Sequence, residues 1–388
     1  MKFAGIITEY DPFHNGHAAQ LQAVRRAGAD CIAVCMSSGA VQRGGVPILP
    51  ESVRVRAALA GGADLVVALP APYACATAEQ FAAAGVRLLS ALGCNVLAFG
   101  AETPDADRLL QTAALLWEEP LQTLLREKLA KGVTYAAARA EAAEALCPGS
   151  GALLRTPNNI LGIEYCKAIL AQAAPLTPMP LPRWGAAHGG AAGEHNGIPM
   201  ASASYLRGLS VAAWAPYVPA EAEALYRQAQ AEGELLDAKR WETAVLSLLR
   251  AIPAEKFADV RAVSEGLEHR LAAAVRQAQG LEDLYTRLKT KRYPHARLRR
   301  LVLDAAFQMP RQLPAPPFLL VLGAKKSALP LLKQARLPAG TSLADLMKTS
   351  PEAAQIGQLH SRAVDFSSLC REKIHPMGLA FTTKPVLL

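Results

Sequence analysis

The chain has 388 residues, 51% of them hydrophobic, and its formal net charge is +8 with a pI of about 9.2. This length and apolar content suffice for two or three domains with a sizeable core, and the basic balance suits a polyanionic partner. The seven cysteines are scattered and form no CxxC pair, which argues against a zinc ribbon or a disulfide framework. No apolar run approaches the roughly 20 residues of a membrane span and no secretory signal is visible, so we expect a cytoplasmic protein without a membrane partner.

Short apolar runs alternate with helical patterns over the first 170 residues. The predicted strands are 3–8, 31–37, 64–70 and 95–102, and the predicted helices are 17–28, 51–62 and 78–93. Alternation of this kind indicates a parallel sheet, and runs that are apolar throughout are typical of strands buried on both faces. We therefore expect an α/β fold with a Rossmann-like parallel sheet.

The rest of the chain is mainly helical in pattern. Helical periodicity covers 105–170 and 203–310, whereas 171–200 is rich in Pro and Gly and is either a linker or a functional loop. The tail is mixed, with a candidate strand at 317–323 and a candidate helix at 327–335. We divide the chain at residue 210, into an α/β domain over 1–210 and a mainly helical region over 211–388.

The stretch TEYDPFHNGH (8–17) follows the first strand and places His14 and His17 three residues apart. Residues at this spacing share one helical face, and a helix N-terminus offers free backbone N–H groups to an anion. Two imidazoles there could donate to phosphate oxygens during displacement at phosphorus, and Gly16 lets a nucleotide approach the backbone. The alternative is that one histidine caps a helix and the other is exposed.

A second motif, SASYLRG (202–208), combines two hydroxyls with a fixed cation. Ser202, Ser204 and Arg207 at a helix start would suit phosphate binding. The alternative is an ordinary capped helix with a surface arginine. The pairing with the histidine motif favours phosphate binding.

The sequence D-P-F-H-x-G-H stands between a predicted strand and a predicted helix. This arrangement resembles the HxGH motif of the nucleotidyltransferase superfamily. Further segments occur in the order found in one family within it: MSSGAVQRGGVPIL (36–49), GADLVVALPAPYA (62–74), FGAE (99–102), TPNNILGIEYCKAIL (156–170), PRWGAAH (182–188) and KTKRY (289–293). The chain thus resembles the tRNA(Met) cytidine acetate ligase family, most strongly over residues 1–210.

This resemblance implies an ATP-dependent ligase with a nucleotidyltransferase domain. Such an enzyme converts acetate and ATP to acetyl-adenylate, and then acetylates N4 of the wobble cytidine (position 34) of elongator tRNA(Met), releasing AMP and pyrophosphate. Its partners would be ATP, acetate and the tRNA. Mg²⁺ would accompany the ATP, although the sequence shows no carboxylate cluster dedicated to a metal.

The resemblance also carries the family's ATP contacts to positions of this chain. They are Ile7, Thr8, Glu9, Tyr10, Phe13, His14, Gly16, His17, Gln20, Gly100, Asn158, Arg183 and Trp184. For Gly100 the alternative is a plain strand-to-loop turn, and for Asn158 it is a helix cap. Arg183 and Trp184 in a Pro/Gly-rich segment are more typical of a functional site than of a linker.

Two departures from the family pattern stand near the predicted site. Pro50-Glu51 replaces a common Asp-Lys, and Ala68 replaces a glutamate. The loop at 42–45, Gln-Arg-Gly-Gly, is either a polar lid over the substrate or simply a flexible loop. The departures leave the substrate contacts in this chain open.

The segment RLKTKRYPHARLRR (287–300) holds seven Lys/Arg and no acid in fourteen residues. Cations placed near phosphates release counterions, and an aromatic ring can stack on an unpaired base. We predict tRNA contacts from Lys289, Lys291, Arg292, Tyr293 and Arg297. The alternative is a solvated helix face.

Two rival functions remain at this point. A small-molecule adenylyl- or cytidylyltransferase would explain the histidine and serine motifs but not the basic segment. A catalytically inactive RNA-binding relative would explain the departure at 50–51, but retention of both histidines argues against it.

Overall fold

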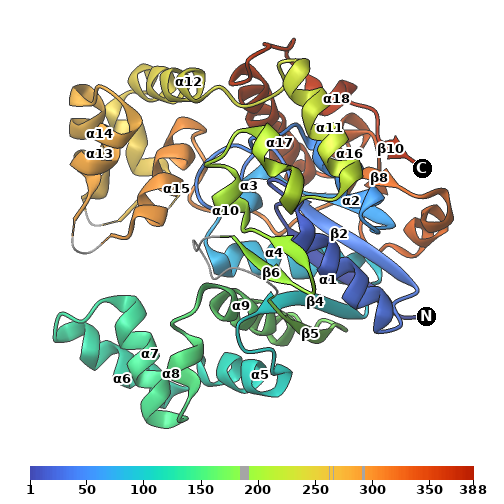
Figure 1. Cartoon of the computed structure of the whole chain (residues 1–388). Coiled ribbons are helices and arrows are strands. Elements are labelled where there is room, and N and C mark those ends of the chain that lie inside the picture. The colour runs from blue at the N-terminus through green and yellow to red at the C-terminus, as the bar shows by residue number, and fades with distance from the viewer. Residues whose placement is uncertain (184–191, 262, 265, 291–292) are drawn as a thin grey trace.

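The computed structural model describes residues 1–388 except 184–191, 262, 265 and 291–292. Its centre is a mixed sheet in the order β10-β8-β3-β2-β1-β4-β5, with β9 paired to β8 (Figure 1). The strands are β1 (Phe3–Thr8), β2 (Cys31–Ser37), β3 (Leu65–Leu69), β4 (Val96–Ala101), β5 (Thr177–Pro182), β8 (Leu319–Ala324), β9 (Ala339–Gly340) and β10 (Val386–Leu387). β6 (Gly193–His195) and β7 (Ile198–Met200) form a separate hairpin.

The predicted parallel sheet is confirmed for β1 to β4. β1 pairs in parallel with β2 and β4, and β2 pairs in parallel with β3. The chain moves from β1 to β3 on one side of β1 and then crosses to β4 on the other side. Ligands of open α/β sheets bind outside the carboxyl ends of strands at such a switch point, and the histidine motif follows β1 directly.

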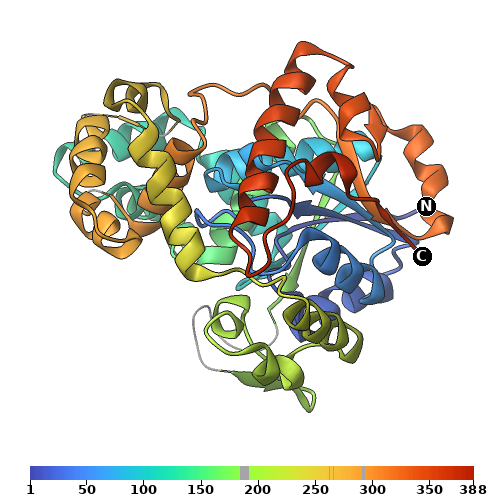
Figure 2. The same cartoon turned by 90° about the horizontal axis from the view of Figure 1, so that it is seen from above.

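Helices cover both faces of this sheet (Figure 2). Successive side chains of a strand point to opposite faces, and each face therefore packs into a core of its own. Phe3 and Ile7 enter one core with α4 and α9, whereas Ala4 and Ile6 enter the other with α1 and α2. On the first face lie α4 (Ala78–Leu92), α5 (Ala106–Leu115), α9 (Pro157–Ala171), the 3₁₀ helix η3 (Lys326–Gln334) and α16 (Leu343–Met347). On the second lie α1 (Asn15–Arg26), α2 (Glu51–Ala60), η1 (Val211–Tyr217) and α11 (Ala220–Ala231).

A third core holds the helical part of the second half together. Its helices are α12 (Ala238–Ala251), η2 (Ala254–Asp259), α13 (Leu267–Gln277), α14 (Leu281–Leu288) and α15 (His295–Ala306), joined by the end of α17 (Pro351–Leu369). Buried Arg261 ties this part to the sheet, because it pairs with Asp304 and donates to the carbonyl oxygens of Pro72 and Cys75. Pro72 belongs to α3 (Ala71–Ala74).

The other helices are short or lie at the periphery. They are α6 (Glu119–Ala130), α7 (Tyr135–Leu146), α8 (Ser150–Leu153), α10 (Ala203–Leu206) and α18 (Leu379–Thr382). None of the helices in the described part of the chain is both long and apolar enough to cross a membrane.

Two features of the sheet differ from a simple reading of the pattern. In the described part of 171–200, β5 adds a parallel edge strand beside β4 despite its three prolines, because an edge strand needs ladder bonds on one side only. The candidate strand at 317–323 forms β8, which pairs antiparallel with β3 and in parallel with β10. The division at residue 210 stays a prediction, and the second half shares the sheet with the first.

Candidate active site

A cavity of about 290 Å³ opens at the carboxyl ends of β1 and β4. Most of the predicted nucleotide and phosphate residues line it: Ile7, Thr8, Glu9, Tyr10, His14, Gly16, His17, Gln20, Gly100, Asn158, Arg183, Ser202, Ser204 and Arg207. Phe13 is completely buried and is not part of the wall, and Trp184 lies outside the described residues. Tertiary folding thus brings segments around residues 10, 100, 158, 183 and 205 to one place.

The two histidines cap the first helix and line the cavity at the same time. His14 is the N-cap of α1, and its Nδ1 accepts the Gly16 N–H at 3.1 Å. The Nδ1 of His17 accepts the His14 N–H at 3.3 Å, so the two imidazoles replace the Ser and Glu of an ordinary capping box. The rings stack with centroids 3.7 Å apart. The alternative in which one histidine caps and the other is merely exposed is therefore wrong.

Capping also fixes the tautomer of both rings. Since each Nδ1 accepts a backbone N–H, the proton of each neutral imidazole resides on Nε2. Burial, with Arg183 and Arg207 nearby, lowers the pKa of His14 to about 3. Burial, His14 and Arg183 hold the pKa of His17 well below its usual value. At neutral pH the pair can therefore offer two uncharged Nε2–H donors, while the positive charge comes from the arginines.

The rings of Phe13 and Tyr10 pack against the histidine pair. The Tyr10 ring lies 4.7 Å from the His17 ring and 4.9 Å from that of Phe13. The Phe13 carbonyl accepts the Tyr226 hydroxyl at 2.8 Å, and its ring closes against Gly61, where a Cβ would meet it at 2.3 Å. Phe13 therefore fixes the loop by packing, and its contact with ATP stays a prediction.

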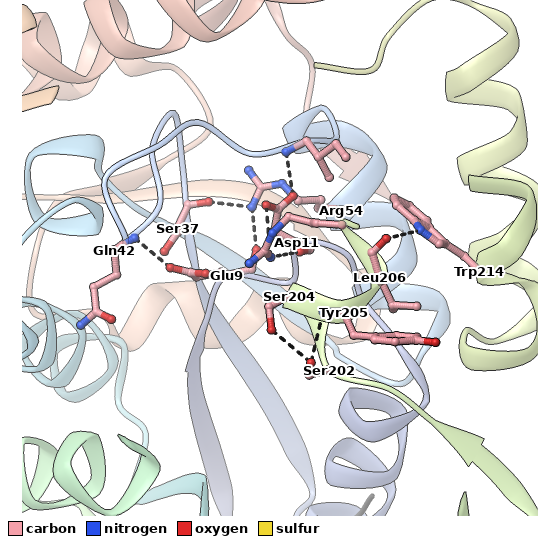
Figure 3. Close-up of polar contacts among 12 residues, drawn as sticks. Glu9, Asp11, Ser37, Gln42, Arg54, Ser202, Ser204, Tyr205, Leu206 and Trp214 are labelled. Atoms are coloured by element: carbon pink, nitrogen blue, oxygen red, sulfur yellow. Dashed lines mark hydrogen bonds and ion pairs between the residues drawn. The ribbon is translucent and has the colours of Figure 1, made fainter. Parts of the chain in front are cut away.

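Arg54 of α2, which the sequence did not single out, joins the ends of two strands (Figure 3). Its side chain is buried, and Nη1 donates to the carbonyl oxygens of Glu9 at 2.7 Å and Ser37 at 2.9 Å. Burial raises the pKa of the Asp11 and Glu51 carboxyls, and Arg54 acts against that rise in both. The guanidinium therefore holds the backbone that leads into the histidine loop.

Asp11 and Arg207 connect the histidine loop to the serine motif. The buried Asp11 carboxylate accepts the Ile48 N–H at 2.9 Å and lies 3.7 Å from Nη1 of Arg207. The same Nη1 donates to the Asp11 carbonyl. Ser202 caps α10 by accepting the Tyr205 N–H at 3.2 Å, and its hydroxyl lies 3.1 Å from that of Ser204 (Figure 3). The cavity is thus lined by the Ser202 and Ser204 hydroxyls and by the Arg207 guanidinium, which Asp11 holds in place.

Glu102 holds the lining residues Asn158 and Arg183 and was also missed, although it stands in the FGAE segment. One oxygen accepts the Asn158 side-chain amide at 2.6 Å, and the other accepts the Asn159 N–H at 2.7 Å. Nη1 of Arg183 is 3.8 Å from Glu102, and the Arg183 side chain passes 3.4 Å from where a Cβ of Gly100 would stand. Burial alone would raise the Glu102 pKa, but the hydrogen bonds from Asn158 and Asn159 lower it. Glu102 therefore positions Asn158 and Arg183, two of the residues predicted to contact ATP.

Comparison with known proteins decides the family. The sequence matches the family model for HIGH Nucleotidyl Transferase over residues 1–378. The tRNA(Met) cytidine acetate ligase of Levilactobacillus brevis is 37% identical over 357 residues, which cover 86% of each chain. The Bacillus subtilis ligase is 34% identical over 310 residues, which cover 78% of this chain and 75% of that one.

The chain belongs to the tRNA(Met) cytidine acetate ligase family. This chain is 25% identical in sequence to Thermotoga maritima TmcAL, whose crystal structure was determined with alpha-thio ATP bound. The structural match covers 100% of both chains and has a TM-score of 0.91. The apo form of the same protein gives a TM-score of 0.92. The sequence-based expectation of an α/β nucleotidyltransferase fold with a helical region is confirmed.

The loop at 42–45 joins the cavity of this family member to its helical region. Gln42 and Arg43 line the cavity, and the Gln42 N–H donates to Glu9 at 2.8 Å. Gly44 has a φ of 79°, and a Cβ there would meet the backbone of Arg299 at 2.4 Å. Only glycine permits this contact, by which α15 packs against the loop.

The basic segment has a mixed outcome in the structure. The Lys289 Nζ donates to the Tyr293 carbonyl at 2.7 Å, and the Arg297 guanidinium lies 4.7 Å from the Tyr293 ring centre. Tyr293 is only 7% exposed and belongs to the third core, so stacking of a base on its ring would require the side chain to leave that core. Lys291 and Arg292 lie outside the described residues. Lys289 and Arg297 stay predictions.

The two departures from the family pattern lie away from the cavity wall. Glu51 opens α2, where its carboxylate accepts the Ser38 hydroxyl, and Ala68 is buried within β3. Neither residue is among those that line the nucleotide cavity. Within the described residues, three or more His, Cys, Asp or Glu do not gather into a group that could hold a metal ion.

Proposed function

We propose that this protein is an ATP-dependent ligase that makes acetyl-adenylate and acetylates N4 of the wobble cytidine of elongator tRNA(Met). The observation that carries the proposal is the stacked pair His14 and His17, which lines a cavity together with Arg183 and Arg207 in a member of this ligase family. Neutral donors beside fixed cations suit a reaction in which negative charge builds up at phosphorus.

ATP would occupy the cavity at the carboxyl ends of β1 and β4. Its phosphates would meet the two histidines, Arg207 and the Ser202 and Ser204 hydroxyls. Asn158 and Arg183, held by Glu102, would contact the nucleoside end, together with Gly100 and the predicted Trp184. The alpha-thio ATP bound in the T. maritima crystal structure supports ATP as the ligand of this fold.

The reaction needs two displacements and no covalent enzyme intermediate. A carboxylate oxygen of acetate attacks the α-phosphorus, and pyrophosphate leaves as the two Nε2–H groups stabilise the developing charge. The cytidine N4 amine then attacks the acetyl carbonyl, the bond to AMP breaks, and N4 loses one proton. Catalysis therefore rests on positioning and on preorganised donors.

Mg²⁺ would enter with the ATP. Mg²⁺ in nucleotide sites keeps several waters and takes one or two carboxylates besides the phosphates. In this cavity Asp11 accepts backbone N–H groups and lies 3.7 Å from Arg207, whereas Glu9 accepts the Gln42 N–H and has Arg207 and Arg43 nearby. Glu9 is thus the residue that would hold the ion, whose role would be to neutralise phosphate charge.

The tRNA would bind to the second half of the chain. We assign ATP binding to 1–210 and RNA binding to 211–388, with phosphate contacts from Lys289, Arg297 and the predicted Lys291 and Arg292. Contact between α15 and the loop at 42–45 supports this, because it brings the basic segment next to the cavity. A tRNA substrate and seven free cysteines fit a cytoplasmic location.

Incubation with labelled acetate, ATP and unmodified elongator tRNA(Met) tests the proposal. The tRNA is digested to nucleosides and analysed by mass spectrometry. We expect N4-acetylcytidine that requires both ATP and acetate. ATP turnover with a phosphorylated metabolite and no RNA would instead indicate a small-molecule nucleotidyltransferase. Binding of tRNA without binding of ATP would indicate an inactive relative.

A further inference from the structure

A second and larger cavity, of about 900 Å³, runs along α4. The α4 residues that line it include Gln80, Ala83, Arg87 and Ala91, which are three or four positions apart. They therefore lie on one face of the helix. The segment 311–316 and residues Arg336 and Leu337 form its other walls. All of these belong to the face of the sheet that carries α4 and α9.

The walls of this groove carry one sign of charge. Four arginines line it, and none of the described lining residues is acidic. Arg261 is neutralised by Asp304, but for Arg87, Arg311 and Arg336 the described residues record no ion pair. Arg87 donates from Nε to the Pro316 carbonyl at 3.0 Å, and Arg311 donates from Nε and Nη2 to the Ala258 carbonyl at 2.8 and 2.6 Å. The described residues record no such bond for the terminal amino groups of Arg87 or for Nη1 of Arg311, which leaves these groups for a ligand.

Amide and hydroxyl groups add to the donors of the groove. Gln80, Gln172 and Gln312 line it with Ser90. Guanidinium groups present planar pairs of N–H donors that match phosphate oxygens, and exposed Arg with no carboxylate partner are typical of phosphate-binding surfaces. The ligand class is therefore an anion that carries phosphates.

The groove begins beside the candidate active site. Phe81 lines the nucleotide cavity, and its chain neighbour Gln80 lines the groove. From Gln80 to Ala91 the helix rises about 16 Å. A mononucleotide is shorter than that, whereas a polynucleotide strand carries a phosphate roughly every 3.4 Å along its axis. Length, charge and position thus favour a polynucleotide that extends out of the active site.

We infer that the groove along α4, with Arg87, Arg311 and Arg336, binds the phosphate backbone of the acceptor tRNA. This inference rests on the proposed function for the identity of the RNA. The contacts are with phosphates, so they position the strand without reading its sequence.

The test replaces Arg87, Arg311 and Arg336 by glutamine in one protein. Binding of unmodified elongator tRNA(Met) is measured by fluorescence anisotropy at several salt concentrations. We expect a loss of affinity of roughly tenfold and a slope of log K against log salt that is shallower by about two, as for the loss of three phosphate contacts. A matched control replaces three exposed cations of the first half that lie outside the groove, Arg26, Arg56 and Lys131. Unchanged affinity, or an equal loss in the control, would overturn the inference.

Pyrophosphate exchange with acetate and ATP separates this result from the proposed function. We expect the groove variant to keep wild-type exchange, because Arg87, Arg311 and Arg336 do not line the nucleotide cavity. Absence of exchange in the wild type would reject the ligase function. Normal exchange with unaltered tRNA binding in the variant would reject the groove alone.

Crosslinking gives a second, independent measurement that leaves the arginines in place. Ala315, an exposed residue of the groove, is replaced by cysteine and labelled with a thiol-reactive photocrosslinker. Cys147, the one cysteine that is not buried, is first replaced by serine. Ala60→Cys on α2, on the other face of the sheet, is the control. We expect crosslinks to tRNA from position 315 only; crosslinks from neither position, or equal ones from both, would overturn the inference.

Discussion

Replacement of Arg54 by methionine is expected to destabilise the protein strongly, although Arg54 does not line the nucleotide cavity. Methionine keeps part of the apolar stem and removes the guanidinium. The variant loses two hydrogen bonds to the carbonyl oxygens of Glu9 and Ser37, and it removes one of the two cations beside each of the Asp11 and Glu51 carboxyls, leaving Arg207 and Arg371. Breaking a buried charge arrangement by removing one partner costs about 3–5 kcal/mol.

The destabilisation should also depend on pH, with a sign that follows from the carboxyls. Burial raises the pKa of Asp11 and Glu51 in the folded state, so their protonation favours folding at low pH and this stabilisation is lost as pH rises through the folded pKa. Without Arg54 both pKa values rise further. The loss in free energy of unfolding should therefore be larger at pH 8 than at pH 5.

Urea unfolding followed by tryptophan fluorescence at both pH values measures the effect. Arg56→Met is the matched control, since Arg56 is exposed on the same helix and should change stability by less than about 0.5 kcal/mol. If Arg54→Met costs no more than the control, or costs the same at pH 5 and pH 8, the reasoning about Arg54 is wrong.

Four further outcomes follow from the site. His17→Ala should slow acetyl-adenylate formation by about 10²–10³, the usual effect of losing one transition-state donor, and should leave tRNA binding intact. In the nucleotide-free protein, NMR should show neither His14 nor His17 titrating between pH 5 and pH 8, because their lowered pKa values keep both neutral. Glu102→Ala should raise the KM for ATP several-fold, since three N–H groups lose their acceptor. Neutralising Lys291 and Arg292 should weaken tRNA binding and make the slope of log K against log salt shallower by about one to two.

Each of these has a control and a contrary result. His269→Ala, on the surface of α13, should leave adenylate formation unchanged, and equal activity of His17→Ala would deny that histidine a catalytic role. A histidine of the pair that titrates near pH 6.5 would contradict the capping geometry. Glu127→Ala, exposed on α6, is the control for Glu102, and a wild-type KM would contradict its positioning role. Unaltered tRNA affinity would reject the basic segment as an RNA contact.

Some features of the cavity could be predicted from the sequence, whereas others depend on the tertiary fold. The order of β1 to β4 and the histidine motif could be predicted, because unbroken apolar runs specify buried strands and the motif lies within one short segment. Glu102 and Arg54 could not be found in this way. Their roles depend on acceptors and donors that lie tens of residues away in the chain, such as Asn158 for Glu102 and Ser37 for Arg54.

The sequence by itself indicated the family, the parallel centre of the sheet and most of the residues that line the cavity at the carboxyl ends of β1 and β4. Only the tertiary structure decided that β8 and β10 complete the sheet, that Phe13 and Tyr293 are core residues, and that four arginines from distant segments line one groove. The reason is physical. Local periodicity and motifs record what each segment prefers, whereas strand order, burial of a given ring and the sign of charge on a surface depend on which distant segments meet.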